Sequence, residues 1–241
     1  MKNHIFGTLL LFLLTIKAVA SPVDSISTVY KNGEFVTYCQ VFVNASDTIC
    51  NSVSMDFDSQ MRNNLDALFG WALKGMNLRK EKNELMMFYF KSTSFNKETN
   101  VIRAVGDVIV PGIITIPNIL VDSKITSKKY VNGKSTVYLD LQSANGFMKN
   151  MNNSFSVIPK KDKGVWYTLE SHVRFGWFFD IFITQTRFKA IMEWRLKRFV
   201  HNLKDEAERR SGKQGKGETG KRVNNLTSQL LRNKQLIIKY G

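Results

Sequence analysis

Residues 165–210 read VWYTLESHVRFGWFFDIFITQTRFKAIMEWRLKRFVHNLKDEAERR and combine two different patterns. The first part, 165–183, is rich in aromatic residues and predicts a long β-strand. In the second part, 184–210, large apolar residues recur every three or four positions, which places them on one face of a helix. These residues are Phe188, Met192, Leu196, Phe199 and Leu203. A helix of about 20 residues is roughly 30 Å long, so it can cross the full width of a curved sheet.

The basic residues of this predicted helix are expected mostly on its other faces. They are Arg187, Lys189, Arg195, Lys197 and Lys204. A second helix is predicted over 54–75, because apolar residues repeat there with the same spacing and Gly75 is well placed to end it. Gly70 is expected to kink this helix or to split it into two.

The remaining apolar runs are short and joined by turns, which predicts an antiparallel sheet rather than βαβ units. The predicted strands are 26–30, 35–43, 85–95, 101–110, 119–130, 135–141 and 155–158. Asn132-Gly133 is the strongest hairpin signal. Pro111 and Pro117 make 113–116 an edge piece or a loop, and 142–153 is expected to be a loop or a short helical turn.

The N-terminal segment predicts export. Residues 1–20 have a basic start, an apolar run and a small-x-small site at Ala18-Val19-Ala20, which is typical of a signal peptide cleaved before Ser21. An uncleaved anchor or a buried helix is the alternative. No later stretch reaches the length of apolar sequence that spans a bilayer. The mature chain is therefore expected to be secreted or periplasmic and to lack a transmembrane segment.

Charge and composition restrict the class of partner. The chain has 241 residues, 43% of them hydrophobic, so 21–210 can form one domain with a real core. Residues 211–241 begin with a Gly/Lys-rich stretch and predict a basic flexible linker and tail. A formal net charge of +15 favours lipid heads or acidic polysaccharide as partners. Nucleic acid is the least expected for an exported chain, and solubility alone is the alternative explanation.

The two cysteines, Cys39 and Cys50, leave two alternatives open. Export permits a disulfide, and the turn-forming residues Asn44 to Asp47 between them allow the chain to close. The other reading is two unpaired thiols that face different ways. Neither cysteine has a neighbour at metal-ligand spacing, so no metal site is predicted.

The sequence offers no convincing catalytic or cofactor site. Residues 215–220 match GxGxxG, but they follow the polar end of a helix instead of a buried strand, which excludes a phosphate-binding loop. Glu170 and His172 are two positions apart on the predicted strand, so both point to the same face and form the one acid/base pair. A surface cross-strand environment is the favoured explanation of this pair, and we predict no catalytic residue and no cofactor.

The order of elements resembles the helix-grip fold of the START-like superfamily, which includes birch-pollen-allergen-like and polyketide-cyclase-like proteins. The resemblance covers about residues 28–210. It is most specific where the aromatic strand runs into the last helix, with the phrase Asn202-Leu203-Lys204-Asp205-Glu206-Ala207-Glu208. It implies an α+β fold in which a curved antiparallel sheet grips a long C-terminal helix. Here an N-terminal helix and a basic tail are added to that arrangement.

The resemblance also implies a hydrophobic cavity between the sheet and the last helix. The residues expected to line it are Phe88, Phe90, Val137, Leu139, Phe175, Trp177, Met192, Leu196 and Phe199. The favoured function is a non-enzymatic, exported binding protein for a hydrophobic or amphipathic, lipid-like small molecule. One alternative is a module that binds anionic surfaces through its basic face and tail. A second is a cyclase- or hydrolase-like enzyme that uses the same cavity.

Overall fold

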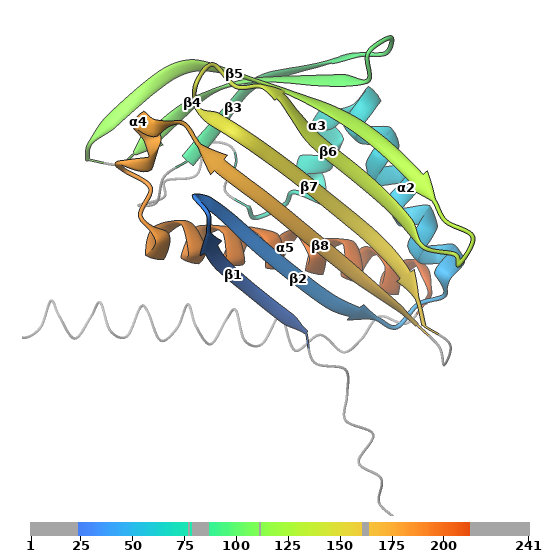
Figure 1. Ribbon diagram of the computed structural model, residues 1–241. Coiled ribbons are helices and arrows are strands. Elements are labelled where there is room, and N and C mark those ends of the chain that lie inside the picture. The colour runs from blue at the N-terminus through green and yellow to red at the C-terminus, as the bar shows by residue number, and fades with distance from the viewer. Residues whose placement is uncertain (1–23, 77, 79–86, 111, 161–163, 213–241) are drawn as a thin grey trace, which may run out of the picture.

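Alternating apolar and polar residues build one curved antiparallel sheet that wraps around a long C-terminal helix (Figure 1). A computed structural model describes residues 24–76, 78, 87–110, 112–160 and 164–212. The strands are β1 (Ser25–Lys31), β2 (Glu34–Val43), β3 (Met87–Asn96), β4 (Val101–Val110), β5 (Ile114–Lys129), β6 (Ser135–Ser143), β7 (Met148–Pro159) and β8 (Val165–Phe175). The helices are α2 (Asp47–Asn63), α3 (Leu65–Gly70), α4 (Trp177–Asp180) and α5 (Gln185–Arg210). The predicted α+β helix-grip fold is confirmed.

The strand order β1-β2-β8-β7-β6-β5-β4-β3 brings the two ends of the domain together. Strand β2 pairs with β8 from Phe35↔Val173 to Val43↔Val165. Helix α5 then lies along β2, because Phe188 stacks on Phe35 with ring centroids 4.0 Å apart and Lys204 Nζ donates to the carbonyl of Phe42 at 2.5 Å. The first and last parts of the sequence thus form one packed unit.

The long predicted strand over 165–183 is interrupted, which corrects that expectation. β8 ends at Phe175, and α4 follows directly after Gly176. The backbone of Gly176 packs against the β6–β7 turn, where its amide donates to the carbonyl of Phe147 at 3.0 Å. A Cβ atom at this position would overlap the carbonyl oxygen of Gly146. This close backbone contact ends the strand, although the apolar pattern of the sequence continues.

The predicted helix over 54–75 also begins and ends elsewhere. α2 starts seven residues earlier, at Asp47, because the Ser46 hydroxyl accepts a hydrogen bond from the Ile49 amide and caps the first turn. The split occurs at Asn64, where the side chain of Asn64 caps α3, and not at Gly70. The side-chain caps therefore set these boundaries, whereas the apolar spacing did not.

Two predicted loops are parts of strands. β5 runs continuously through Pro117, because β5 itself contains a bulge in which Pro117 and Asn118 oppose Asp107 of β4. The Asp107 carboxylate accepts from the Asn118 amide at 2.9 Å. Residues in a bulge are outside the regular hydrogen-bond pairing between strands. A proline, which has no amide hydrogen to donate, is therefore tolerated at position 117. Strand β7 starts at Met148, inside the predicted loop 142–153. The Asn132-Gly133 turn between β5 and β6 is confirmed, with both flanking strands in register.

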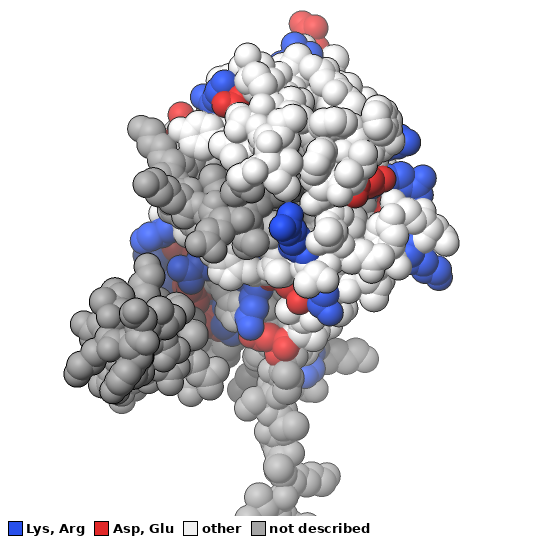
Figure 2. Space-filling view, turned by 90° about the vertical axis from the view of Figure 1, so that its left-hand side faces the viewer, with Lys and Arg blue, Asp and Glu red and all other residues white. Residues whose placement is uncertain are grey.

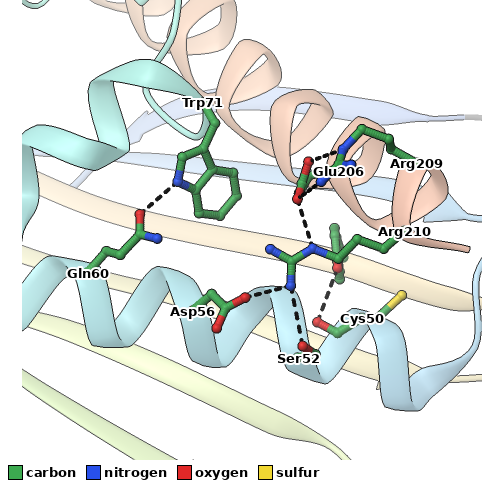
Figure 3. A network of polar contacts seen from close by, with 9 residues as sticks. Cys50, Ser52, Asp56, Gln60, Trp71, Glu206, Arg209 and Arg210 are labelled. Carbon is green, nitrogen blue, oxygen red and sulfur yellow. Dashed lines mark hydrogen bonds and ion pairs between the residues drawn. The ribbon is translucent and has the colours of Figure 1, made fainter.

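The C-terminal end of α5 is fixed to α2 by charged side chains (Figure 3). Arg210 donates to Asp56 of α2 at 2.5 Å and to Glu206 of α5 at 2.8 Å. It also donates to the hydroxyl of Ser52 at 3.3 Å. The three partners of Arg210 come from two helices, so this seam joins α5 to α2.

The two cysteines do not form the disulfide that was one of the two sequence alternatives. Cys39 on β2 and Cys50 on α2 are free and buried. Each packs as a small apolar group among the residues that surround α2. Burial raises the pKa of Cys39 to about 12 and that of Cys50 to about 11, so both stay protonated thiols.

Residues 1–23 and 213–241 lie outside the described part of the chain. The signal peptide over 1–20 and the basic linker and tail over 211–241 therefore stay predictions. Among the helices that the structure describes, none is at once long and apolar enough to cross a membrane.

Candidate functional site

The interior between the sheet and α5 contains two separate apolar clusters along the helix. We call the first the α2 cluster; it surrounds the C-terminal half of α5 and includes Phe57, Phe155 and Phe199. The second, the α4 cluster, surrounds the N-terminal half of α5 and includes Phe35 and Phe188 together with residues of α4, β4 and β5. The core under α5 is thus divided in two.

Aromatic rings fill both clusters. In the α2 cluster, the ring centroid of Phe199 lies 5.2 Å from that of Phe57 and 5.9 Å from that of Phe155. In the α4 cluster, Phe188 stacks on Phe35 and meets Phe175 edge-on at 5.6 Å. Offset and edge-to-face contacts of this kind are the favourable arrangements of aromatic pairs. These residues therefore act first as core packing.

A row of polar side chains crosses the inner face of the sheet between the two clusters. Register pairs place Thr28 opposite Thr37, Thr37 opposite Ser171, and Ser171 opposite Asn153. Thr37 and Ser171 are buried, with 0% and 2% exposure, and the hydroxyls of Thr28 and Thr37 lie 2.9 Å apart. We call these four residues the polar row.

The polar row separates the clusters because residues two positions apart on a strand share a face. On β8, Leu169 belongs to the α2 cluster and Val173 to the α4 cluster, with Ser171 between them. On β2, Cys39 and Phe35 flank Thr37 in the same way. The polar break is therefore repeated on neighbouring strands at one level of the sheet.

Arg195 occupies the corresponding place on α5. It lies two turns after Phe188 and one turn before Phe199, so it shares the buried face of the helix with both. Arg195 lies about 10 Å from Phe188 along the axis of α5, which runs beside β2. On β2, the same length corresponds to about three residues. Measured from Phe35, this places Arg195 level with Thr37 and Cys39. The sequence expectation that placed Arg195 on an outer face is wrong.

The guanidinium of Arg195 is buried without a partner. Its Nε and Nη2 atoms are shielded from solvent and have no hydrogen-bond acceptor among the described residues. Burial lowers its pKa to about 10, which still leaves it charged at neutral pH. A buried charge that lacks a partner costs several kcal/mol, on the order of the penalty measured when one half of a buried ion pair is removed. Such a group calls for an explanation.

Glu193 does not supply the missing partner. Its Oε1 atom is also buried without a hydrogen bond among the described residues. Residues two apart on a helix point to nearly opposite sides, so Glu193 and Arg195 cannot pair. His201 Nε2, also on α5, is buried without a hydrogen bond as well, but it lies 3.5 Å from a carboxylate oxygen of Asp24. Of Glu193 and Arg195, only Arg195 lies on the face that holds Phe188 and Phe199.

The residues predicted to line a cavity are found in three kinds of environment. Phe175, Phe199 and Val137 are buried, and Phe90, Leu139, Met192 and Leu196 are half-buried against the clusters. Trp177 is 71% exposed on α4, so the expectation that it lines the interior is wrong. The backbone of Phe88 lies on β3, but its side chain is outside the described part of the structure.

Val137 and Leu139 do not lie under α5. They pack with Ile102 and Ile125 in a third cluster. Sequence reasoning missed Arg195, Thr37 and Ser171 because it searched for large apolar residues. The available signal was a charged residue at an apolar position of the helical repeat.

The Glu170–His172 pair is on the outer face of the sheet, as predicted. His172 Nε2 lies 2.7 Å from Glu170, and its Nδ1 lies 3.3 Å from Glu34. The hydrogen bond to Glu170, followed by that to Glu34, raises the pKa of His172 against the opposing effect of burial. Both ring nitrogens are occupied by carboxylates, which makes the group a surface ion cluster. No group of metal-binding side chains occurs among the described residues.

A hollow of about 620 Å³ lies on the surface at the β3–β4 turn, away from α5. It is lined by the turn itself, from Ser94 to Thr99, together with Val101 and Arg103. It contains no cluster of convergent acid, base or nucleophile, so we do not assign it a function.

Comparison with known proteins adds a likeness of shape. No protein-family model and no curated protein sequence matches the chain. Among solved structures, an aromatase/cyclase from Streptomyces sp. R1128 is similar, with 12% identity and a TM-score of 0.45 over 73% of this chain and 95% of that chain. A START superfamily protein from Mycobacterium smegmatis has 14% identity and a TM-score of 0.43 over 72% and 97%.

Norcoclaurine synthase from Thalictrum flavum is similar at 12% identity and a TM-score of 0.43, over 76% of this chain and 96% of that chain. At such identities and TM-scores the likeness says nothing about a ligand or an activity. The element order and strand pairing of the protein itself carry the assignment. The chain therefore has a helix-grip fold, the arrangement implied by its resemblance to the START-like superfamily.

Proposed function

We propose that the protein is exported and binds a hydrophobic or amphipathic small molecule between the sheet and α5, without catalysing a reaction. The observation that carries the proposal is the polar break in the apolar interior, formed by the polar row and Arg195. A core that served packing alone would gain stability from apolar residues at these places. Apolar clusters on either side of a polar level suit a ligand with both kinds of surface.

Room for a ligand is expected to come from side chains that can move. Met148, Met151 and Met192 are half-buried and border the α4 cluster. Methionine has three rotatable bonds and adapts to irregular spaces at little cost. The α4 end is also held differently from the α2 end, since the seam made by Arg210 ties α5 to α2 only. We therefore place the ligand toward the α4 cluster.

Binding of dodecan-1-ol to the purified protein, followed by native mass spectrometry, tests this proposal. Ser171→Val replaces a hydroxyl of the polar row with an apolar side chain and should weaken binding of dodecan-1-ol at least tenfold. Thr168→Val is the matched control, because Thr168 is buried on the opposite face of the same strand. Equal binding by both variants would refute an interior site.

A second candidate is supported by the surface around α4. Trp177 and Ile181 are 71% and 64% exposed, and Ile113 at the neighbouring β4–β5 turn is 53% exposed. Figure 2 shows a broad area without charged side chains on this side of the molecule, with both basic and acidic side chains around it. Arg187 and Lys189 on the first turn of α5, which follows α4 in the chain, are exposed basic residues.

Exposed tryptophan beside basic residues suits the interface of an anionic membrane. We infer that the α4 end of the molecule binds anionic lipid heads. The basic tail, which was also expected to contribute, lies outside the described residues. Sedimentation with vesicles of phosphatidylcholine, with and without phosphatidylglycerol, tests this. The double variant Trp177→Ser, Ile181→Ser should bind anionic vesicles at least tenfold more weakly than Val131→Ser, an exposed apolar control at another turn. Equal binding of the two would exclude α4 as the contact.

A further inference from the structure

We propose that the ligand carries an oxyanion, a carboxylate or a phosphate monoester, and that Arg195 binds it inside the protein. This inference rests on the proposed function and adds the chemical class of the ligand. The unpartnered atoms of Arg195 are Nε and Nη2, both shielded from solvent. They are the two donors on one edge of the guanidinium, the edge that forms parallel hydrogen bonds to two oxygens.

The same edge binds carboxylates elsewhere in this protein. Arg103 donates from Nε and Nη2 to the two oxygens of Asp122 at 2.8 and 2.7 Å. Arg209 uses the same two atoms on Glu206, at 2.7 Å each. On the surface, therefore, this geometry is completed by an acid of the chain. At Arg195 the described residues offer no such acid, and an acidic ligand completes it.

The surroundings of Arg195 specify the rest of the ligand. Thr37 and Ser171 bring hydroxyl groups to the same level of the interior. Hydroxyls can donate to the free lone pairs of a carboxylate or to the third terminal oxygen of a phosphate. The α4 cluster lies on one side of that level and provides apolar contacts. A molecule with a single anionic head and an apolar body fits both features. A fully apolar molecule would leave the guanidinium unpaired.

Three probes of equal chain length test the inference: dodecanoate, dodecyl phosphate and dodecan-1-ol, titrated into the purified protein by calorimetry. We expect one or both anions to bind at least tenfold more tightly than the alcohol. A preference for dodecanoate identifies a carboxylate site, and a preference for dodecyl phosphate identifies a phosphate site. Arg195→Gln should remove the preference, and Arg195→Lys should keep part of it, because a lysine retains charge without the two-donor edge.

Arg187→Gln is the control, since Arg187 is exposed on the first turn of α5. It should leave the preference unchanged. Without ligand, Arg195→Gln should melt at the same or a higher temperature than the wild-type protein, because it removes an uncompensated buried charge. A lower melting temperature would show that Arg195 is satisfied within the protein and would overturn the inference.

The outcomes separate the two proposals. If all three probes bind equally and Arg195→Gln has no effect, the anion site is wrong while interior binding stands. If none of the three binds, the proposed function itself fails. If the anions bind better but Arg187→Gln abolishes the preference, the anion is held on the surface and Arg195 is not its receptor.

Discussion

Gly176 shows how one residue decides where an element ends. Its amide hydrogen bonds to Phe147, and there is no space for a side chain against Gly146. Gly176→Ala should therefore force the β6–β7 turn away from α4 and destabilise the protein by about 1–3 kcal/mol, as overpacking does. Urea unfolding measures this. Gly70→Ala is the control, since nothing lies within 4 Å of an added Cβ and no positive φ is involved; it should be neutral or slightly stabilising.

The two cysteines give a second prediction at the residue scale. Their pKa values are raised by burial, to about 12 for Cys39 and about 11 for Cys50, so almost no thiolate exists at pH 8. A disulfide-exchange reagent such as dithionitrobenzoate should modify neither thiol in the folded protein and both in denaturant. Absorbance at neutral to mildly alkaline pH reports the reaction. Fast modification of the folded protein, or no free thiol after unfolding, would contradict the structure.

At the scale of elements, the seam between α2 and α5 makes a prediction about helix docking. Arg210 links Asp56 and Ser52 to Glu206, and its side chain is 28% exposed. Arg210→Ala should cost about 1 kcal/mol, because part of a hydrogen-bonded ion network is lost. Arg209 contacts only Glu206 within the described residues and is 58% exposed, so Arg209→Ala should cost less than half as much. Equal effects in chemical unfolding would show that the interhelical contact adds nothing.

The ion cluster on the outer face of β2 and β8 should make the stability of the protein depend on pH. Hydrogen bonds to Glu170 and Glu34 raise the pKa of His172 above 6.5, so its contribution is complete below pH 6.5 and is lost as pH rises through the higher value. Burial opposes the shift of Glu34, but hydrogen bonds from Asn150 and His172 lower its pKa below 4.5, so its contribution is lost as pH falls through that lower value.

Both contributions are therefore present between about pH 4.5 and 6.5. Relative to wild type, His172→Gln should lose most stability in that window, by a few tenths to about 1 kcal/mol for a partly exposed cluster. The difference should shrink above neutral pH. Thermal melts over a pH series measure it. A difference that grows toward alkaline pH would contradict the assigned direction.

For the whole molecule, the proposed site predicts coupling between ligand and stability. A ligand that binds only the folded protein adds about 2.7 kcal/mol at a hundred times its dissociation constant. For a domain of this size, that raises the melting temperature by roughly 5–10 °C. Dodecanoate should produce this shift in the wild-type protein and a smaller one in Arg195→Gln. An equal shift in both proteins would place the bound acid elsewhere.

The sequence by itself determined most strands of the antiparallel sheet, the hairpin at Asn132-Gly133 and the residue range of α5, because strand alternation, turn residues and helical spacing are local patterns. The resemblance of this element order to the START-like superfamily then implied the helix-grip fold. The sequence also named most residues of the interior, since large apolar side chains are mostly buried. Trp177 was placed wrongly because the end of β8 depends on a contact with Gly146, far back in the chain.

Only the tertiary structure decided where the core is divided. Thr37, Ser171 and Asn153 come from three strands that are distant in sequence, and each alone is an ordinary strand residue. They form one polar row because strand register aligns them, and Arg195 meets that level because α5 lies along β2. A local pattern does not contain register or docking position, which are set by the packing of the whole domain.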